Sequence, residues 1–229
     1  MEATGRFGSE DLSRSNAREK IVDAACELFH QRGYRAVGVQ EICDSAGVQK
    51  GSFYHFFRSK QELALAMLDQ TWLRMQELKF TPAFRDELPP LQRIERYLEI
   101  LPQVFGELRM SQGAVCGCPF GNMALEMSTH DDAIRRKLDS IYRAWARYLE
   151  DCLDEAIECG DLPAIDTRTA ADSVVAYISG MAVLAKTRNS LDATASLRPA
   201  VLALIHPTLL ERLGPPRPQP APSASPPAG

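Results

Sequence analysis

The chain has 229 residues, of which 45% are hydrophobic, and a formal net charge of −4. A chain of this length can bury a substantial core, either as one large domain or as a small domain joined to a larger one. Its longest apolar run, Val174–Ala185, is shorter than the roughly 20 residues that span a bilayer, and the N-terminus has no apolar signal segment. We therefore expect a cytoplasmic protein without a membrane span.

Charge and cysteine content narrow the function classes further. Residues 1–60 carry nine Lys and Arg against eight Asp and Glu, so the acidic excess lies in residues 61–229. This balance gives no support of its own to DNA binding, which must be argued from motifs. The six cysteines form no CxxC pair and the four histidines are scattered, so neither a metal site nor a cofactor is predicted.

Both ends of the chain are expected to be disordered. Residues 1–15 are polar and predict a disordered N-terminal arm, and residues 214–229 are a Pro-rich tail of low complexity. Between them, apolar residues recur at helical spacing and period-two alternation is missing, which predicts an all-α fold. We expect a helix-turn-helix domain over residues 16–60 and a larger helical domain over residues 61–213.

The first helix is predicted to begin at a capping pair, Asn16 with Glu19, and to end at Gly33. Two short helices follow on either side of a break at Gly47, the first at about residues 39–46 and the second carrying Phe53, Phe56 and Phe57 and ending at Arg58. Ser59 and Glu62 predict a capping box that opens a long helix to about residue 80. Further helices are expected near residues 91–108, 119–128, 131–159, 167–189 and 194–212.

The two short helices around Gly47 are typical of a helix-turn-helix, whose second helix lies in the major groove of DNA. Phe53, Phe56 and Phe57 are expected to pack in the core of this unit. Its outward positions are rich in donors that suit phosphates and base edges. The residues expected to contact DNA are Arg18, Gln40, Gln49, Lys50, Gly51, Ser52, Tyr54, His55 and Lys60.

The run from Ala17 to Leu65 resembles the DNA-binding domain of the TetR family of bacterial transcriptional repressors. The matching elements are LFHQRGY, the Ala46-Gly47-Val48 turn, FYHF and SKQEL, in that order. Two positions depart from the family pattern: Val37-Gly38 replaces the usual hydroxyl pair before the second helix, and Gln49 replaces the usual serine before the third. The resemblance implies a homodimer that binds a double-stranded, palindromic operator, with a C-terminal domain that binds a small inducer and dimerises through its last two helices.

The stretch GCPFGN raises a separate hypothesis about sensing. Pro119 suits the first position of a helix, which makes Cys118 the expected N-cap and predicts a lowered thiol pKa. The stretch also resembles a motif in a TetR subgroup that includes sensors of reactive electrophiles and hypochlorite. In that subgroup the motif cysteine reacts and a lysine on a later helix lies close to it, which would be Lys186 here.

Several alternatives to thiol sensing remain open at this point. Cys116 and Cys118 are also suitable soft ligands for Cu(I), with Met123 and Met127 as thioether partners. Equally, Cys118 is a simple helix cap if the pocket binds an unreactive apolar ligand. The residues expected at the ligand or redox site are Cys116, Cys118, Lys186, Phe120, Trp145 and Tyr177.

The favoured function is therefore a ligand- or redox-responsive repressor that releases its operator. A cysteine-dependent enzyme is the alternative from another class, but His130 is the sole weak partner for a nucleophilic thiol, so no catalytic residue is predicted. A purely architectural DNA-binding protein is disfavoured, because it does not need about 150 residues beyond the DNA-binding unit.

Overall fold

The computed structural model describes the backbone of residues 7–214 and the side chains of residues 16–211, 213 and 214. Every regular element in this part of the chain is helical, as the sequence predicts. The elements are α1 (Phe7–Arg32), α2 (Val39–Ala46), α3 (Lys50–Phe56), α4 (Lys60–Met75), the π-helix η1 (Gln76–Phe80), α5 (Thr81–Ala83), α6 (Pro90–Gln112), α7 (Pro119–Met127), α8 (Asp132–Glu158), α9 (Thr167–Arg188), the 3-10 helix η2 (Asp192–Ser196), α10 (Leu197–Ile205) and α11 (Thr208–Leu213).

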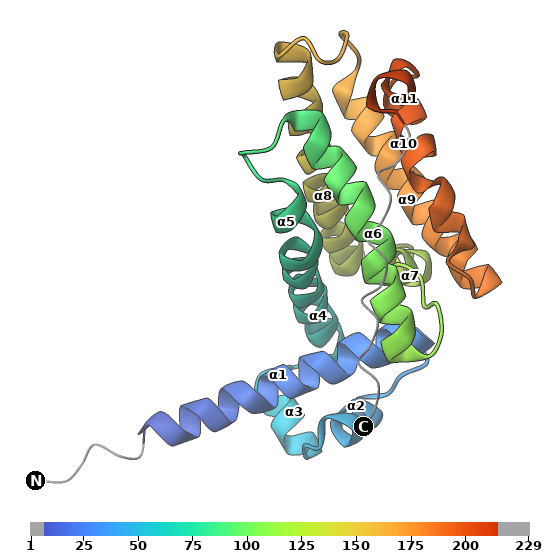
Figure 1. The fold of residues 1–229 in the computed structure, drawn as a ribbon. Coiled ribbons are helices and arrows are strands. Elements are labelled where there is room, and N and C mark those ends of the chain that lie inside the picture. Colours follow the sequence, from blue (N-terminus) through green and yellow to red (C-terminus); the bar gives the residue numbers. More distant parts are fainter. Residues whose placement is uncertain (1–6, 215–229) are drawn as a thin grey trace, which may run out of the picture.

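The helices form two units (Figure 1). Helix α1 crosses the lower end of the molecule with α2 and α3 beneath it, and α4 rises from there into a bundle made by α5 to α11. None of the helices that the structure describes combines the length and the hydrophobicity needed to cross a bilayer.

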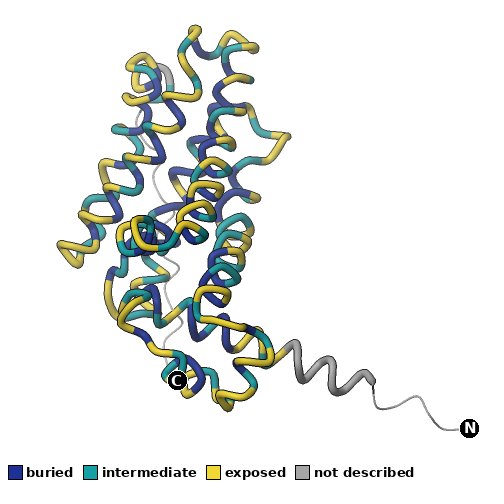
Figure 2. Tube along the Cα trace, turned by 180° about the vertical axis from the view of Figure 1, so that it is seen from behind, coloured by how far each residue is buried: buried dark blue, intermediate teal, exposed yellow. Residues whose placement is uncertain are grey.

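The lower unit is held by a small apolar core that reaches both of its short helices. Ile21 and Ala25 of α1, Ile42 of α2 and Phe53 of α3 are fully buried, and Figure 2 colours segments of this lower unit as buried. Gly47 ends α2 with φ of 65°, a left-handed conformation that costs a glycine little. The expected core role holds for Phe53 and Phe57, whereas Phe56 is half-buried.

Two expected helix boundaries are wrong. Helix α1 begins at Phe7, so Asn16 lies within the helix instead of capping it. The expected helix over residues 194–212 is divided into η2, α10 and α11, with a break at His206 and Pro207. Pro207 lacks the N–H that would continue α10, which explains the break. The expected tail residues 1–6 and 215–229 lie outside the described residues.

Helix α4 starts at the predicted capping box. Ser59 Oγ accepts the N–H of Glu62 at 3.1 Å, and the Glu62 carboxylate accepts the N–H of Arg58 at 2.8 Å. The helix does not continue regularly to residue 80, because its last turn widens into the π-helix η1. Such π segments are rare and are often found at functional sites.

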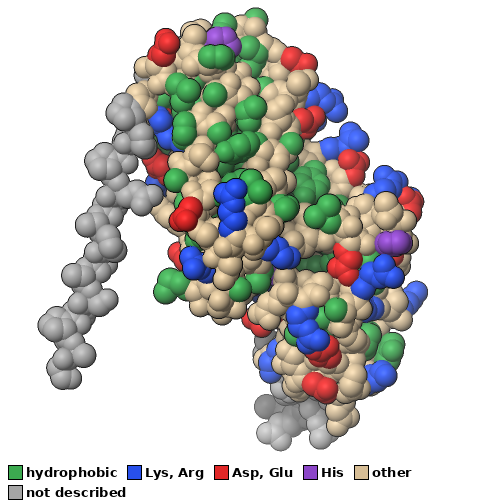
Figure 3. All heavy atoms as spheres, turned by 90° about the vertical axis from the view of Figure 1, so that its right-hand side faces the viewer, with side chains coloured by type: hydrophobic (Ala, Val, Ile, Leu, Met, Phe, Trp, Pro, Cys, Tyr) green, Lys and Arg blue, Asp and Glu red, His purple; other side chains and the backbone are tan. Residues whose placement is uncertain are grey.

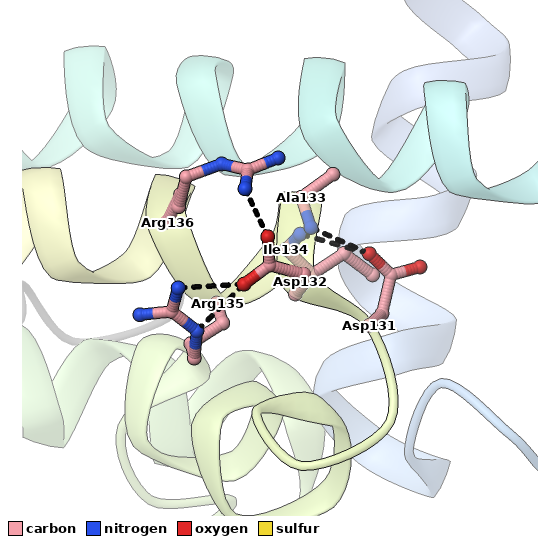
Figure 4. A network of polar contacts seen from close by, with 6 residues as sticks. All are labelled: Asp131, Asp132, Ala133, Ile134, Arg135 and Arg136. Carbon is pink, nitrogen blue, oxygen red and sulfur yellow. Dashed lines mark hydrogen bonds and ion pairs between the residues drawn. The ribbon is translucent and has the colours of Figure 1, made fainter.

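The next helix boundaries are set by local polar contacts as well. The Asp131 carboxylate caps α8 by accepting the N–H groups of Ala133 and Ile134, both at 3.0 Å (Figure 4). Asp132 faces Arg135 and Arg136 in the same turn, where a negative charge also suits the positive end of the helix. Gln61 Nε2 donates to Asp131 Oδ2 at 2.7 Å, which ties the start of α4 to the start of α8.

Candidate DNA-binding surface and sensor site

Helix α3 presents a polar surface to solvent. Lys50, Gly51, Tyr54 and His55 are exposed, as is Gln49 just before the helix, and Ser52 is half-buried. The space beside Gly51 is open, so a DNA backbone can come close to the helix there. Neither Gly38 before α2 nor Gln49 before α3 makes a side-chain capping bond, as expected from the missing hydroxyls. The structure thus brings the expected DNA contacts of α3 together on one short helix.

The flanking residues that were expected to grip DNA have partners within the protein. Lys60 Nζ donates to the carbonyl of Val37 at 2.6 Å and lies 4.2 Å from the ring centroid of Tyr34. Gln40 Nε2 donates to Asp44 Oδ1 at 2.8 Å. Arg18 lies in the interior of α1 and not at its start, and its guanidinium is 5.4 Å from the Phe57 ring centroid. Lys60 thus braces the turn before α2.

Cys118 occupies the predicted N-cap of α7, but its environment is not the predicted one. The side chain is buried, at 7% exposure. Burial raises the pKa of the Cys118 thiol, against the opposing effects of the Gly121 N–H, the Lys79 ammonium and the Phe120 N–H. The expectation of a lowered pKa is therefore wrong, because desolvation outweighs the helix terminus.

A cavity lies beside Cys118 and is enclosed by residues of α6, α8 and α9, among others. Its enclosed room is small, about 10 Å³ or roughly one water molecule, and the wider hollow around it is partly open to solvent. Its walls are mostly apolar, which suits a small-molecule site. The lining residues are Met75, Lys79, Leu101, Phe105, Leu108, Gly117, Cys118, Pro119, Trp145, Ile178 and Ala182.

Of the residues expected at the sensor site, Cys118 and Trp145 line this cavity and four others do not. Phe120 is fully buried against Trp72, with ring centroids 6.2 Å apart. Tyr177 faces η2, where its hydroxyl lies 3.3 Å from Ser196 Oγ. Cys116 is half-buried, with its sulfur 3.8 Å from the Ala114 carbonyl.

Lys186 lies near the loop before α7 but is exposed. Its Nζ donates to Asn122 Oδ1 at 3.2 Å, and an added Cβ at Gly117 would lie 3.2 Å from Lys186 Cδ. Asn122 Nδ2 in turn donates to the Cys116 carbonyl at 2.8 Å. Lys186 therefore stabilises the loop, and the cation that acts on the Cys118 thiol is Lys79.

Lys79 is a functional candidate that the sequence reasoning missed. It is 3% exposed and lines the cavity from η1. Burial lowers the pKa of Lys79 to about 8, opposed by the Cys118 sulfur. The available signal was its spacing from Leu68, Trp72 and Met75, which continues the apolar face of the preceding helix.

Two sets of hydrogen bonds connect the loop and helix at Cys118 to the DNA-binding unit. His30 Nε2 lies 3.0 Å from the Gly117 carbonyl, and His30 Nδ1 lies 3.1 Å from Gln112 Nε2. At the other end of α7, the Glu126 carboxylate accepts the N–H of Tyr34 at 2.8 Å and that of Arg35 at 2.6 Å. Helix α7 therefore has the buried thiol at its start and holds the α1–α2 turn near its end.

The Cu(I) alternative, which relies on the thioethers of Met123 and Met127, stays a prediction. Within residues 7–214, no three His, Cys, Asp or Glu side chains cluster in a way that suits a metal ion. The remaining cysteines are scattered: Cys43 and Cys152 are buried, Cys26 is half-buried and Cys159 is exposed. Cys43 is part of the buried core, and Cys26 packs against it.

An apolar surface runs along α9, α10 and α11. Val183, Leu184, Leu204 and Leu210 are between 37% and 48% exposed. Figure 3 views the side of the molecule on which these helices lie and shows hydrophobic side chains between the charged ones over its upper part. We refer to these four residues as the α9–α11 face.

Comparisons with known proteins agree with this arrangement. The family model for bacterial regulatory proteins of the tetR family matches residues 21–67, and the model for the tetracyclin repressor-like C-terminal domain matches residues 91–201. The transcriptional regulator AcuR of Cereibacter sphaeroides is 33% identical over 160 residues, which is 69% of this chain and 69% of AcuR.

Solved structures show the same fold. A regulatory TetR protein from Rhodobacter sphaeroides superposes with a TM-score of 0.71 at 30% identity, covering 81% of this chain and 96% of that protein. The reduced form of NemR from Escherichia coli superposes with a TM-score of 0.70 at 26% identity, covering 81% and 94% of the two chains. The chain belongs to the TetR family of bacterial regulatory proteins, with an N-terminal helix-turn-helix and a C-terminal helical domain.

Proposed function

We propose that the protein is a homodimeric repressor that acts in the cytoplasm and releases a palindromic operator when a small molecule, electrophile or oxidant acts at the Cys118 cavity. The observation that carries the proposal is the double role of α7. Its N-cap is Cys118, which lines the cavity, and its last turn carries Glu126, which holds the turn between α1 and α2. A ligand that moves α7 thereby moves the DNA-binding unit.

DNA contact is proposed for the exposed side of α3. Lys50, Tyr54 and His55 supply a cation, a hydroxyl and an imidazole on a helix that the family places in the major groove. Gln49, Gly51 and Ser52 extend the same surface. Arg18, Gln40 and Lys60 are proposed to support it through their contacts within the unit, since each already has a partner there.

The α9–α11 face is proposed as the surface that pairs two copies of the chain. Its exposed apolar side chains are the type that a dimer interface buries, and the family is typically dimeric. A dimer fixes the separation of its two α3 helices at about one turn of DNA. Small rotations of each DNA-binding unit then change the fit to both half-sites at once.

Two modes of induction remain within the proposal. In the covalent mode, the Cys118 sulfur adds to the electrophilic carbon of an unsaturated carbonyl compound, and the thiol proton ends on the neighbouring carbon. In the reversible mode, a ligand fills the cavity without a bond to sulfur. The burial of Cys118 and its raised thiol pKa favour the reversible mode, because the thiolate is the attacking species.

Fluorescence anisotropy with the DNA upstream of the protein's own gene tests both modes. Wild type, Cys118→Ser and the control Cys116→Ser are titrated with N-ethylmaleimide or hypochlorite while bound to DNA. Covalent sensing predicts release of wild type and Cys116→Ser, with Cys118→Ser remaining bound. Equal release of all three proteins would exclude Cys118 as the switch, and a failure of wild type to bind any operator would refute the regulator proposal itself.

A further inference from the structure

Lys79 is a buried cation without an anionic partner. Its side chain is 3% exposed, and its Nζ lies 4.0 Å from Met75 Sδ and 5.3 Å from the Phe105 ring centroid. No carboxylate within the described residues forms an ion pair with it, and Cys118 is the sole group that opposes its desolvation. Buried lysines are rare unless they are paired, because an isolated charge is costly in an apolar environment.

The neighbouring thiol does not supply the missing charge. Burial raises the pKa of the Cys118 thiol, so the thiol stays protonated and neutral near pH 7. The sulfur and thioether around Lys79 are at most weak acceptors for its three N–H donors. The ammonium of Lys79 therefore lacks a negatively charged hydrogen-bond acceptor.

A second donor in the same cavity is also unsatisfied. Trp145 lines the cavity, and its buried indole Nε1 makes no hydrogen bond of normal geometry with any described residue. The buried Tyr97 hydroxyl lies beside this indole, in a weak contact that falls short of a hydrogen bond of normal geometry. An indole N–H can only donate, so the ammonium and the indole call for the same kind of partner, an oxygen acceptor.

The backbone around Lys79 is unusual in the same place. Residues 76–80 form the π-helix η1, and within it Lys79 and Phe80 are buried while Glu77 and Leu78 face solvent. This wide turn buries a lysine and exposes a leucine. Its position against the cavity matches the frequent occurrence of π segments at functional sites.

We propose that this cavity binds a small organic monocarboxylate, with the carboxylate on Lys79 Nζ and its apolar chain against Phe105, Trp145 and Ile178. This inference rests on the proposed function, because it names the chemical class of the effector that the C-terminal domain takes. The apolar walls select against strongly hydrated anions such as phosphate, whereas a carboxylate with a hydrocarbon chain satisfies both the donors and the walls.

Isothermal titration calorimetry with pentanoate and its neutral counterpart pentanamide tests the assignment on the full-length protein. Because a charge-assisted hydrogen bond contributes roughly 1.5–3 kcal/mol, pentanoate is expected to bind wild type at least about tenfold more tightly than pentanamide. Lys79→Met is expected to remove that advantage and to leave pentanamide binding nearly unchanged. Lys20→Met, at an exposed position of α1, is the control and keeps the wild-type preference.

Several results would overturn the assignment. Equal binding of acid and amide by wild type would do so, as would undiminished pentanoate binding by Lys79→Met, or no binding of any straight-chain acid from three to eight carbons. Lys79→Gln, which removes the charge and keeps polarity, serves if Lys79→Met does not fold.

The assignment and the proposed function fail in different ways. If pentanoate binds through Lys79 but never releases DNA in the anisotropy assay, the carboxylate site stands and its role as the effector site is refuted. If a reagent that modifies Cys118 releases DNA while no carboxylate binds, the proposed repressor stands and the carboxylate site is refuted.

Discussion

The Glu126 carboxylate accepts the backbone N–H of Tyr34 at 2.8 Å and, through its second oxygen, that of Arg35 at 2.6 Å. Both donors lie in the turn after α1, where no helical carbonyl is available to them. One side chain of α7 therefore replaces the hydrogen bonds that this turn lacks. The contact joins the C-terminal helical domain to the DNA-binding unit.

Glu126→Ala is expected to destabilise the protein by about 1–3 kcal/mol, because two N–H groups lose a charged acceptor. It is also expected to weaken the response of DNA binding to an inducer. Urea unfolding measures the first effect and the anisotropy titration the second. Glu107→Ala, at an exposed position of α6, is the control, and a loss of similar size there would contradict the assignment.

Gly33→Ala is expected to disturb the same contact from the other side. Gly33 has φ of +88°, and an added Cβ would lie 3.0 Å from Glu126 Oε2. The strained backbone and the displaced carboxylate together predict a loss of about 1–3 kcal/mol. Gly106→Ala, within α6 and beside open space, should instead be neutral or stabilise by up to about 1 kcal/mol. Thermal unfolding of the two variants gives the comparison.

Lys50→Gln is expected to weaken operator binding and to reduce its salt dependence, because each lysine that contacts phosphate releases about one counterion on binding. A dimer loses two such contacts, so the slope of log K against log salt should fall by roughly 1–2. Anisotropy titrations at several salt concentrations measure it. An unchanged slope, or an equal change in the exposed Arg147→Gln control of α8, would count against contact through Lys50.

Lys79→Met is expected to stabilise the ligand-free protein. Folding lowers the pKa of Lys79 from 10.5 to about 8, so the charged form is disfavoured in the native state. Below pH 8 Lys79 is protonated in both the folded and the unfolded protein. The cost of burying its charge is then fully present, roughly 3 kcal/mol at 1.36 kcal/mol for each pKa unit. As pH rises from 8 toward 10.5, the native state releases the proton first and the cost shrinks.

The difference in unfolding free energy between Lys79→Met and wild type should therefore be largest near pH 7 and decline by pH 9.5. Urea unfolding at four pH values between pH 7 and 9.5 measures this difference in unfolding free energy. A constant difference would mean that the charge of Lys79 carries no cost in the folded protein.

Because of His30, the stability of the protein is also expected to depend on pH in the acidic range. Burial lowers its pKa, the Gly117 carbonyl opposes the shift, and Lys186 and Lys79 add to it. Above pH 6.5 His30 is neutral in both the folded and the unfolded protein, and its contribution to the free energy of unfolding is fully present. As pH falls below 6.5, the unfolded state binds the proton first, so stability is lost. Wild type should thus lose more stability between pH 7.5 and 5 than His30→Asn. Urea unfolding measures this, and exposed His130→Asn should follow wild type.

Local sequence signals predicted much of this architecture. Ser59 with Glu62 and Pro119 after Cys118 mark helix starts that the structure confirms, because capping depends on a few adjacent residues. The start of α1 could not be read the same way, since Asn16 is as compatible with a helix interior as with a cap. Pro207 was an available signal for the break after α10 that the prediction passed over.

The sensor cavity was less predictable, because it depends on contacts between distant segments. A lysine in a polar stretch is expected in solvent, and Lys79 is buried because the π-turn directs it toward α6, α8 and α9. The position of Cys118 followed from the sequence, but its raised pKa follows from burial beneath other helices. Trp145 and Tyr177 were both expected at the site, but Trp145 lines it and Tyr177 faces η2, because helical spacing alone does not define which neighbours a helix meets.

Helix α7 has nine residues and is therefore only about 13 Å long, so its two ends move as one body. In the proposed repressor, the effector site at Cys118 and the anchor at Glu126 are separate, and either can change in sequence while the other is kept. A lineage that replaces the cavity walls can acquire a new inducer without rebuilding the connection to DNA. This short helix thus makes the stimulus an evolvable property and the response a fixed one.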